Sequence, residues 1–148
     1  PDIGSLNVHA AGGGMRKGIL SQVAAQIADS GINIRSVITS QTCISFLLSL
    51  KDLEPGKKAL LGIKPRPFRR LETVDGAALI GIVGEGLSRK PGIAARCFTA
   101  AAECRVNIEM IAFGPSPVAL YFLVRKANLQ KAVAAIHSHF FGAAHCRL

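Results

Sequence analysis

The sequence has few aromatic residues and no long apolar run. It contains no tryptophan and one tyrosine, while 49% of its 148 residues are hydrophobic, so a buried core must consist mainly of aliphatic side chains and alanine. No apolar run approaches the roughly 20 residues that a membrane-spanning helix needs. No signal-peptide pattern opens the chain either. We therefore expect a cytoplasmic protein that has no membrane partner.

Cysteine is also scarce, and its spacing indicates no metal or redox motif. The four cysteines are Cys43, Cys97, Cys104 and Cys146. No CxxC pair occurs among them, so we expect free thiols in a reducing compartment. Histidines and a cysteine gather near the C-terminus, at His137, His139, His145 and Cys146. Because His137 and His139 are two residues apart, they face different sides of a helix, and we predict no metal site.

Acidic residues are few as well. Nine Asp and Glu stand against eighteen Lys and Arg, which gives a net charge of +9. A basic protein can bind nucleic acid, but here no basic stripe is interleaved with aromatic residues and no zinc-finger or helix-turn-helix pattern occurs. We therefore expect no nucleic-acid partner, and interpret the cations as solvated surface or as a face toward an acidic neighbouring domain. A basic nucleic-acid-binding α/β module stays open as a third alternative.

What the sequence does contain is a clear order of helix, strand, turn and strand. Residues 18–30 form a predicted amphipathic helix whose apolar stripe comprises Ile19, Val23 and Ile27. Gly31 follows where a helix-ending residue with φ > 0 is wanted. Two apolar runs from Ile32 to Leu48, joined by the polar residues 39–42, then predict two strands and a turn.

The same order is repeated in residues 91–124. Gly18-Ile19 corresponds to Gly92-Ile93, and Asn33-Ile34 corresponds to Asn107-Ile108, both at a shift of 74 residues. We expect this shift to slip by about one residue inside the turn. An internal repeat of this length predicts two similar units.

The flanking segments complete these units. The first reads β-α-β-β-α-β, with further elements predicted at residues 5–11, 51–63 and 68–74. The second opens with a strand at 77–83 and ends with a helix at 128–140, and it lacks a convincing closing strand. We place the units at residues 1–75 and 76–148, with Asp75-Gly76 as a turn between them. The fold class is therefore α+β, with two tandem ferredoxin-like units, each an antiparallel sheet with helices on one face.

The beginning of the chain has no methionine and enters a strand within a few residues. It looks like the middle of a longer protein. We expect a segment upstream of Pro1 to supply the closing strand that the second unit lacks, since an unpaired sheet edge invites association.

Two long segments carry a resemblance to a known family. VGEGLSRKPGIAARCFTAAAECRVNIEMIAFGPSPVALYFLV with LQKAVAAIHSHFF is similar to the C-terminal regulatory region of aspartate kinase, and GILSQVAAQIADSGINIRSVITSQTCISF looks like the first ACT unit of the same region. The resemblance implies tandem ACT domains that sense an end product of aspartate-derived amino-acid synthesis, in feedback control of lysine, threonine and methionine. It implies three partners: an amino-acid effector, which is lysine or threonine; a catalytic domain of the same protein; and a second copy of the chain, bound through the ACT units.

The resemblance also implies that the chain is not itself an enzyme. ATP and magnesium would serve only a catalytic domain elsewhere, so no cofactor is expected here. The sequence is consistent with this expectation, since it shows no recognisable set of a nucleophile, a general base and a residue that orients the base. The alternative is a stand-alone ACT-type metabolite-binding regulatory protein.

Two glycine-rich loops imitate nucleotide sites incompletely. Gly84-Glu85-Gly86 follows a predicted strand, but Arg89 holds the third glycine position of a dinucleotide fingerprint. The run Gly12-Gly13-Gly14 lacks the GK[ST] ending of a phosphate loop, because Lys17 is followed by Gly18. We therefore favour neither.

The best candidate site is the start of the first helix. Free backbone N–H groups and the helix dipole suit a carboxylate there, and glycine allows a close approach. The polar turn can bind an amino group or a side chain, and the resemblance adds two residues of the second unit. The predicted effector-binding residues are Met15, Gly18, Ile19, Leu20, Arg35, Thr39, Ser40, Gln41, Asn107 and Ile108. The alternative is that these residues only cap helices and form turns.

Arg35 departs from the family pattern. Lysine-inhibited relatives carry an acidic residue just after the N-x-I strand start, where this chain has Arg35. A cation there would repel a lysine side chain. We therefore expect threonine, or another small uncharged amino acid, rather than lysine.

Overall fold

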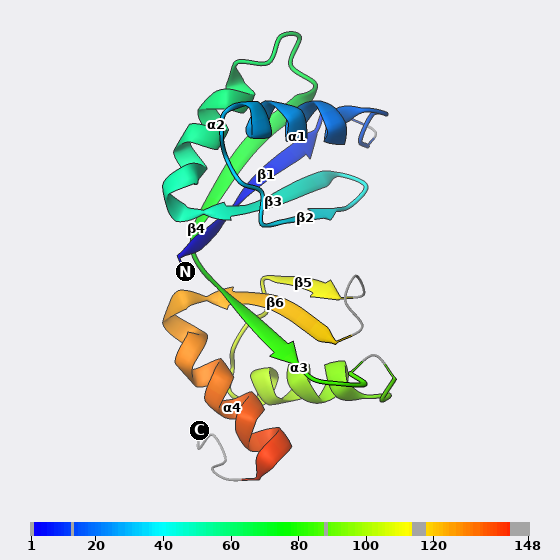
Figure 1. Cartoon of the computed structure of the whole chain (residues 1–148), viewed down its shortest axis with the longest axis vertical. Coiled ribbons are helices and arrows are strands. Elements are labelled where there is room, and N and C mark those ends of the chain that lie inside the picture. The colour runs from blue at the N-terminus through cyan, green and yellow to red at the C-terminus, as the bar shows by residue number, and fades with distance from the viewer. Residues whose placement is uncertain (1, 13, 88, 114–117, 143–148) are drawn as a thin grey trace. The chain divides into compact units, whose positions relative to one another are not determined.

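The computed structural model describes residues 2–12, 14–87, 89–113 and 118–142 and divides the chain into two compact units, Pro1–Gly76 and Ala77–Leu148 (Figure 1). The elements of the first unit are β1 (Ile3–Ala10), α1 (Ile19–Asp29), β2 (Ser36–Thr39), β3 (Cys43–Ser49), α2 (Leu53–Leu61) and the first part of β4 (Phe68–Val83). Those of the second unit are the rest of β4, α3 (Ile93–Glu103), β5 (Met110–Phe113), β6 (Ala119–Arg125) and α4 (Leu129–Phe141). Short 3-10 helices, Leu50–Asp52 and Lys126–Asn128, lead into α2 and α4. No helix within the described ranges is long and apolar enough to cross a membrane.

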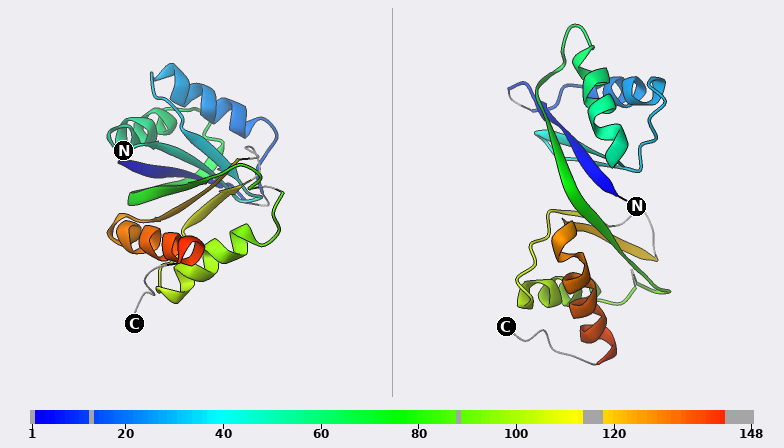
Figure 2. Two further views of the ribbon diagram at one scale, coloured as in Figure 1. Left: turned by 60° about the horizontal axis from the view of Figure 1, so that its bottom comes forward. Right: turned by 90° about the vertical axis from the view of Figure 1, so that its left-hand side faces the viewer.

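Each unit is a small antiparallel sheet with helices on one face (Figure 2). The strand order in the first unit is β2-β3-β1-β4, and Phe46 of β3 lies opposite Leu6 of β1 and Val37 of β2. The second unit has the order β4-β6-β5, with Leu123 of β6 opposite both Leu79 and Met110. These arrangements confirm the predicted α+β ferredoxin-like fold.

The core of the first unit forms because α1 buries the apolar stripe read from its sequence. Ile19, Val23 and Ile27 are all at most 3% exposed and pack in one cluster with Leu6 and Phe46 of the sheet. Burying a side chain of this size contributes about 1.5–3 kcal/mol. These contacts fix which face of α1 meets the sheet.

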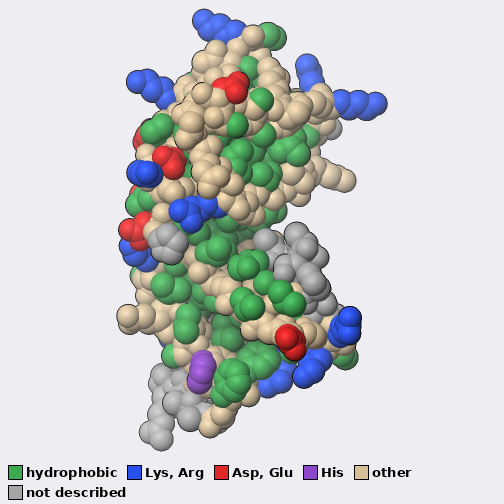
Figure 3. Space-filling model, viewed as in Figure 1, with side chains coloured by type: hydrophobic (Ala, Val, Ile, Leu, Met, Phe, Trp, Pro, Cys, Tyr) green, Lys and Arg blue, Asp and Glu red, His purple; other side chains and the backbone are tan. Residues whose placement is uncertain are grey.

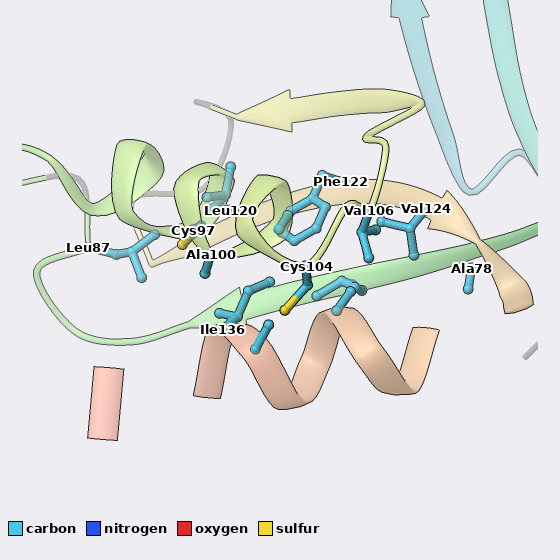
Figure 4. Packing of buried hydrophobic residues seen from close by; sticks show 14 residues of the cluster. Ala78, Leu87, Cys97, Ala100, Cys104, Val106, Leu120, Phe122, Val124 and Ile136 are labelled. Atoms are coloured by element: carbon cyan, nitrogen blue, oxygen red, sulfur yellow. The ribbon is translucent and has the colours of Figure 1, made fainter. Parts of the chain in front are cut away.

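The second core uses smaller residues (Figure 4). Buried α3 positions are Cys97, Ala100 and Ala101, and Phe122 of β6 packs in the same cluster. Its ring meets that of Phe98 edge to face, with the ring centroids 6.0 Å apart. Both cores are mainly aliphatic and alanine, as the composition predicts.

The repeat extends to every element from β1 to α2, and the counterparts run from the second part of β4 to α4. From β1 to β2 the corresponding elements are 74 residues apart, as in α1 and α3, and from β3 onward they are 76 apart, as in α2 and α4. The turn between the strands therefore absorbs two residues, and the expected slip of about one was wrong. Backbone contacts repeat as well, since Arg35 N–H donates to Leu47 O and Glu109 N–H donates to Leu123 O, each at 2.9 Å.

The predicted turn at Asp75-Gly76 was also wrong, because β4 continues through both residues. An Asp-Gly pair predicts a hairpin only when the flanking strands pair with each other. Here β4 neighbours β1 in the first unit and β6 in the second. Gly76, the last residue of the first unit, nevertheless has a positive φ of 66°.

The strands β2 and β5 begin later than the apolar runs suggest. Ile32 N–H donates to Ile27 O and Gly31 N–H donates to Ala28 O, the pattern that closes a helix with a left-handed residue. Gly31 has φ of 73°, which confirms its predicted role. Ile32 is therefore a buried residue of the helix end rather than the first residue of a strand.

The cysteines only partly follow the prediction of free thiols. Cys43 and Cys97 are free, and burial raises the pKa of the Cys97 thiol. Cys104 is disulfide-bonded, so the expectation was wrong for this residue. Sequence spacing could not show this, because disulfide formation depends on which sulfur atoms meet in space. Cys146 lies outside the described residues.

The two helix ends offer a test of backbone strain. Arg105 follows α3 at the position that corresponds to Gly31 after α1, and it has φ of 53°. The left-handed region costs an L-residue about 1–2 kcal/mol, and about 0.5–1 kcal/mol of this is offset because glycine loses more entropy on folding. We expect Arg105→Gly to raise the free energy of unfolding by about 0.5–1 kcal/mol in urea denaturation.

The matched control places the same new residue inside the helix. Ala102→Gly, three residues earlier in α3, should lower stability by about 0.5–1 kcal/mol. Equal effects of the two glycines would contradict a strained Arg105.

Candidate functional site

The start of α1 is an exposed helix N-terminus without a capping side chain. Gly18 is its N-cap residue, with φ of 83° and ψ of −7°, no side chain caps the first-turn amides, and the first turn lacks acidic residues. Ser21 Oγ donates to the Gly18 carbonyl at 2.9 Å. A Cβ at Gly18 would meet nothing within 4 Å, so glycine is needed for its φ and not for space. Ile19 N–H donates to Arg16 O over 3.3 Å, so the first-turn amides left for a carboxylate are those of Leu20 and Ser21.

The loop before α1 is tied to the turn between β2 and β3. Met15 N–H donates to the carbonyl of Gln41 over 3.0 Å, and Ala10 N–H donates to Thr42 O over 2.9 Å. A Cβ on Gly14 would lie 3.4 Å from the Gln41 oxygen, so the loop runs close to the turn. The structure thus brings the loop, the α1 start and the polar turn to one end of the first unit.

Within the turn, Ser40 has a structural role. Its hydroxyl accepts hydrogen bonds from Cys43 N–H at 3.0 Å and Thr42 N–H at 3.3 Å, and lies 3.2 Å from Cys43 O. The Thr39 and Gln41 side chains are exposed and make no hydrogen bond to any described residue. They are the polar side chains that this turn leaves available to a ligand.

Arg35 lies at the other end of the hairpin. Its guanidinium donates to Ser49 Oγ from Nη2 at 3.1 Å and from Nε at 3.3 Å. Arg35 precedes β2, whereas Gln41 follows it, and a strand rises about 3.3 Å per residue. The structure therefore separates Arg35 from the α1 start and the turn by roughly 15 Å along the strand direction.

The two predicted residues of the second unit correspond to Asn33 and Ile34 of the first. Ile108 is half-buried against the second core. Asn107 donates from Nδ2 to Glu109 Oε1 at 3.2 Å, and Arg125 Nε reaches the same oxygen at 3.4 Å. Glu109 thus occupies the repeat position of Arg35, and Arg125 that of Ser49. The sequence analysis missed this difference between the Arg35–Ser49 pair and the Glu109–Arg125 pair, although an alignment of the two repeats would have shown it.

The other sequence candidates find no support in the described part of the chain. No group of three or more His, Cys, Asp or Glu there could hold a metal ion. His145 and Cys146 lie outside it, as does Gly13 of the glycine run. In the second glycine loop, Arg89 and Lys90 N–H groups both donate to Gly86 O, which makes a closed turn.

The assignment of Ser40 to the turn can be tested by truncation. Ser40→Ala removes a hydroxyl that three backbone groups contact, so we expect the free energy of unfolding to fall by about 0.5–1.5 kcal/mol. Thr39→Ala, one residue earlier and without such bonds, should change it by less than about 0.5 kcal/mol. Urea denaturation of both variants measures the difference, and similar values would contradict this role for Ser40.

Comparisons with known proteins agree with the fold and the repeat. The sequence profile of the ACT domain family matches residues 80–140. Aspartate kinase FUB3 of Gibberella moniliformis is 25% identical over 140 residues, which cover 95% of this chain and 28% of that protein. The chain spans less than a third of the length of the first curated relatives that it matches.

Two solved structures show the same fold. The regulatory subunit of aspartate kinase from Thermus flavus has a TM-score of 0.82 at 23% identity, with 94% of this chain and 93% of that one covered. Aspartokinase III of E. coli, in complex with lysine and aspartate, has a TM-score of 0.75 at 24% identity over 95% of this chain and 31% of that one. Residues 80–140 are thus an ACT domain, and over nearly its whole length the chain resembles the regulatory part of aspartate kinases.

Proposed function

We propose that this chain binds a free amino acid and regulates the aspartate kinase catalytic domain to which it belongs. The observation that carries the proposal is the hydrogen bond from Met15 N–H to Gln41 O, because it holds an uncapped helix N-terminus beside a polar turn. The ACT domain and the likeness to aspartate kinase regulatory subunits support it. The chain itself would not phosphorylate aspartate, and ATP and magnesium would bind the catalytic domain.

The chemistry of this end of the unit suits an amino acid. The effector carboxylate would receive hydrogen bonds from the first turn of α1, worth about 0.3–1 kcal/mol when exposed and up to about 2 kcal/mol when partly buried. The ammonium and side chain would meet the Thr39 hydroxyl and the Gln41 amide. Residues 3–28 and 30–51 contain no Asp or Glu, so a lysine side chain would find no carboxylate on β2, on β3 or on α1 before its last residue, Asp29. This scarcity of carboxylates favours threonine, whereas Arg35, bonded to Ser49, lies too far from the α1 start to repel a lysine side chain.

We expect an acid in the first turn of α1 to weaken effector binding. Ser21→Glu places a carboxylate where we expect the effector carboxylate, at a helix position that tolerates acids. We expect a thermal-shift screen of the twenty amino acids to find a ligand for the wild type, because a specific ligand stabilises the folded state. Calorimetric titration should then show at least about tenfold weaker binding by Ser21→Glu.

Two controls locate the effect. Ala95→Glu makes the matched change in the first turn of α3 and should leave the affinity unchanged if the ligand binds the first unit. Arg35→Asp should change lysine and threonine affinities by less than about twofold, since exposed charges at this separation are screened. Unchanged binding by Ser21→Glu, or a large gain in lysine affinity in Arg35→Asp, would contradict the proposed location.

We also propose that the chain forms a homodimer through its ACT units. The edge strand β2 supports this, because it has β3 on one side only and exposes Val37 at 38%. Light scattering at high micromolar concentration should give at least twice the mass of 15.6 kDa. A monomer alone at that concentration would contradict the assembly.

A stand-alone regulatory protein is the second candidate. The Thermus flavus chain that this one resembles is a regulatory subunit of nearly the same extent, since 93% of it is covered. A coding sequence for a kinase domain continuous with this one would exclude that candidate.

A further inference from the structure

The sheet of the second unit has an edge that is covered in the first unit. In the first unit the strand order is β2-β3-β1-β4, so the first part of β4 lies along the outer side of β1. The counterpart of β1 in the second unit is the second part of β4, residues 77–83, and among the described residues of that unit it pairs with β6 alone. We call the side of residues 77–83 that faces away from β6 the open edge.

The inner side chains next to the open edge are less well buried than their counterparts in the first unit. Val8 of β1 is fully buried, whereas Ile82, which corresponds to it, is half-buried. Phe46 and its counterpart Phe122 belong to the strands on the other side, and both are fully buried. The difference therefore lies on the side of the open edge. Hydrophobic side chains also reach the surface of the second unit (Figure 3).

The first unit shows what kind of side chain is missing. Leu53 of α2 is 4% exposed, whereas its counterpart Leu129 of α4 is half-buried. Leu53 belongs to the core cluster that contains Phe68 of β4, and Leu71 of β4 packs against the same cluster. These two side chains have no counterpart among the described residues of the second unit. A strand that closes the second sheet must therefore bring large apolar side chains toward the helices.

The sequence of the open edge lacks the features that keep exposed edges apart. Residues 76–84 read GAALIGIVG, with no charged residue and no proline. The other described edge strands, β2 and β5, have four residues each, and the first part of β4 carries Arg69, Arg70 and Glu72. Natural sheets protect an exposed edge by shortness or by charge, so residues 77–83 have the composition of a covered strand.

The start of β1 lies beside the point where β4 enters the second unit. A Cβ on Gly4 would lie 2.7 Å from Val74 O, and His9 Nε2 lies 3.1 Å from Glu72 Oε2. Residue numbers thus fall along β4 as they rise along β1, so the two neighbouring strands are antiparallel (Figure 1). A chain that continued β1 backward beyond its first residue, in the same direction, would run along the open edge.

We infer that an extended segment preceding Pro1 pairs antiparallel with the open edge and is the fourth strand of the second unit. It presents large apolar side chains at alternate positions toward α3 and α4, as Phe68 and Leu71 do toward the helices of the first unit. The same polypeptide is the source, because the curated relatives extend far beyond the part that this chain matches. The inference concerns the second sheet and does not depend on which effector binds the first unit.

The test compares this chain with the same chain extended by the residues that its gene encodes before Pro1, about ten of which span the open edge. We expect hydrogen exchange of alternate amides in residues 77–83 to be at least about tenfold slower in the extended chain, because the N–H groups that face away from β6 gain acceptors. The amides of β2 are the internal control, since β2 stays an edge strand and its exchange should change by less than about twofold.

A matched pair of designed extensions tests the side-chain requirement. Both place alternating Val and Thr before Pro1 and differ only in phase, since a shift of one residue moves every side chain to the other face. One phase should raise the melting temperature of the chain and the other should not, because only one directs valine toward the core.

Four outcomes would overturn the inference. The first two are unchanged exchange at residues 77–83 in the naturally extended chain and equal melting temperatures of the two designed chains. The third is slow exchange of these amides in the unextended chain that is lost when residues 143–148 are removed, which would assign the strand to those residues. The fourth is slow exchange that is lost on dilution, which would assign it to a second copy.

Discussion

Burial of one apolar stripe of each helix against one face of a short sheet is the interaction on which the rest of each unit depends. Ile19, Val23 and Ile27 fix the rotation of α1 about its axis, because only that face can meet Leu6 and Phe46. Once α1 is fixed, its first turn must begin at the end of the sheet where β1 finishes. The chain reaches this point through Gly18 at positive φ, so the exposed amides follow from the packing.

Comparison of the two units shows that this packing constrains few of the exposed residues. Both keep a glycine before the first helix, with φ of 83° at Gly18 and 85° at Gly92, and both repeat the same hydrogen bond at the start of the hairpin. Their exposed residues have nevertheless diverged: Glu109 bonded to Arg125 stands where Arg35 bonds Ser49. Differences of this kind cost the fold little, since exposed ion pairs contribute about 0–1 kcal/mol. They are therefore where the two units can differ in function.

The sequence was sufficient for those features that depend on local periodicity. The helices were predicted correctly from apolar stripes at helical spacing. The end of α1 was predicted from its glycine, and the two similar units from the repeat. It was insufficient where a residue's role depends on its partner in space. Asp75-Gly76 has the composition of a turn, but the neighbours of β4 make it part of a strand. Ser40 is a residue type that often contacts ligands, but its hydroxyl is hydrogen-bonded to backbone groups of Thr42 and Cys43 within the turn.

The candidate site divides in the same way. The helix start could be predicted because an N-terminus exposes amides whatever surrounds it. Arg35 could not be placed, because adjacency to Ile34 in sequence says nothing about which end of the hairpin a long side chain reaches. Its bond to Ser49, fourteen residues later, depends on the register of β2 and β3.

An effector at the α1 start can influence another surface only through a difference in affinity between two states of the protein, with a coupling of typically about 1–3 kcal/mol. This amount is comparable to one or two hydrogen bonds. The element common to both units is β4, whose first part neighbours β1 and whose second part pairs with β6. Within β4, Gly76 departs from strand geometry with φ of 66°, at the boundary of the two units. Gly76 is therefore the residue of β4 at which this strand passes from the first unit to the second.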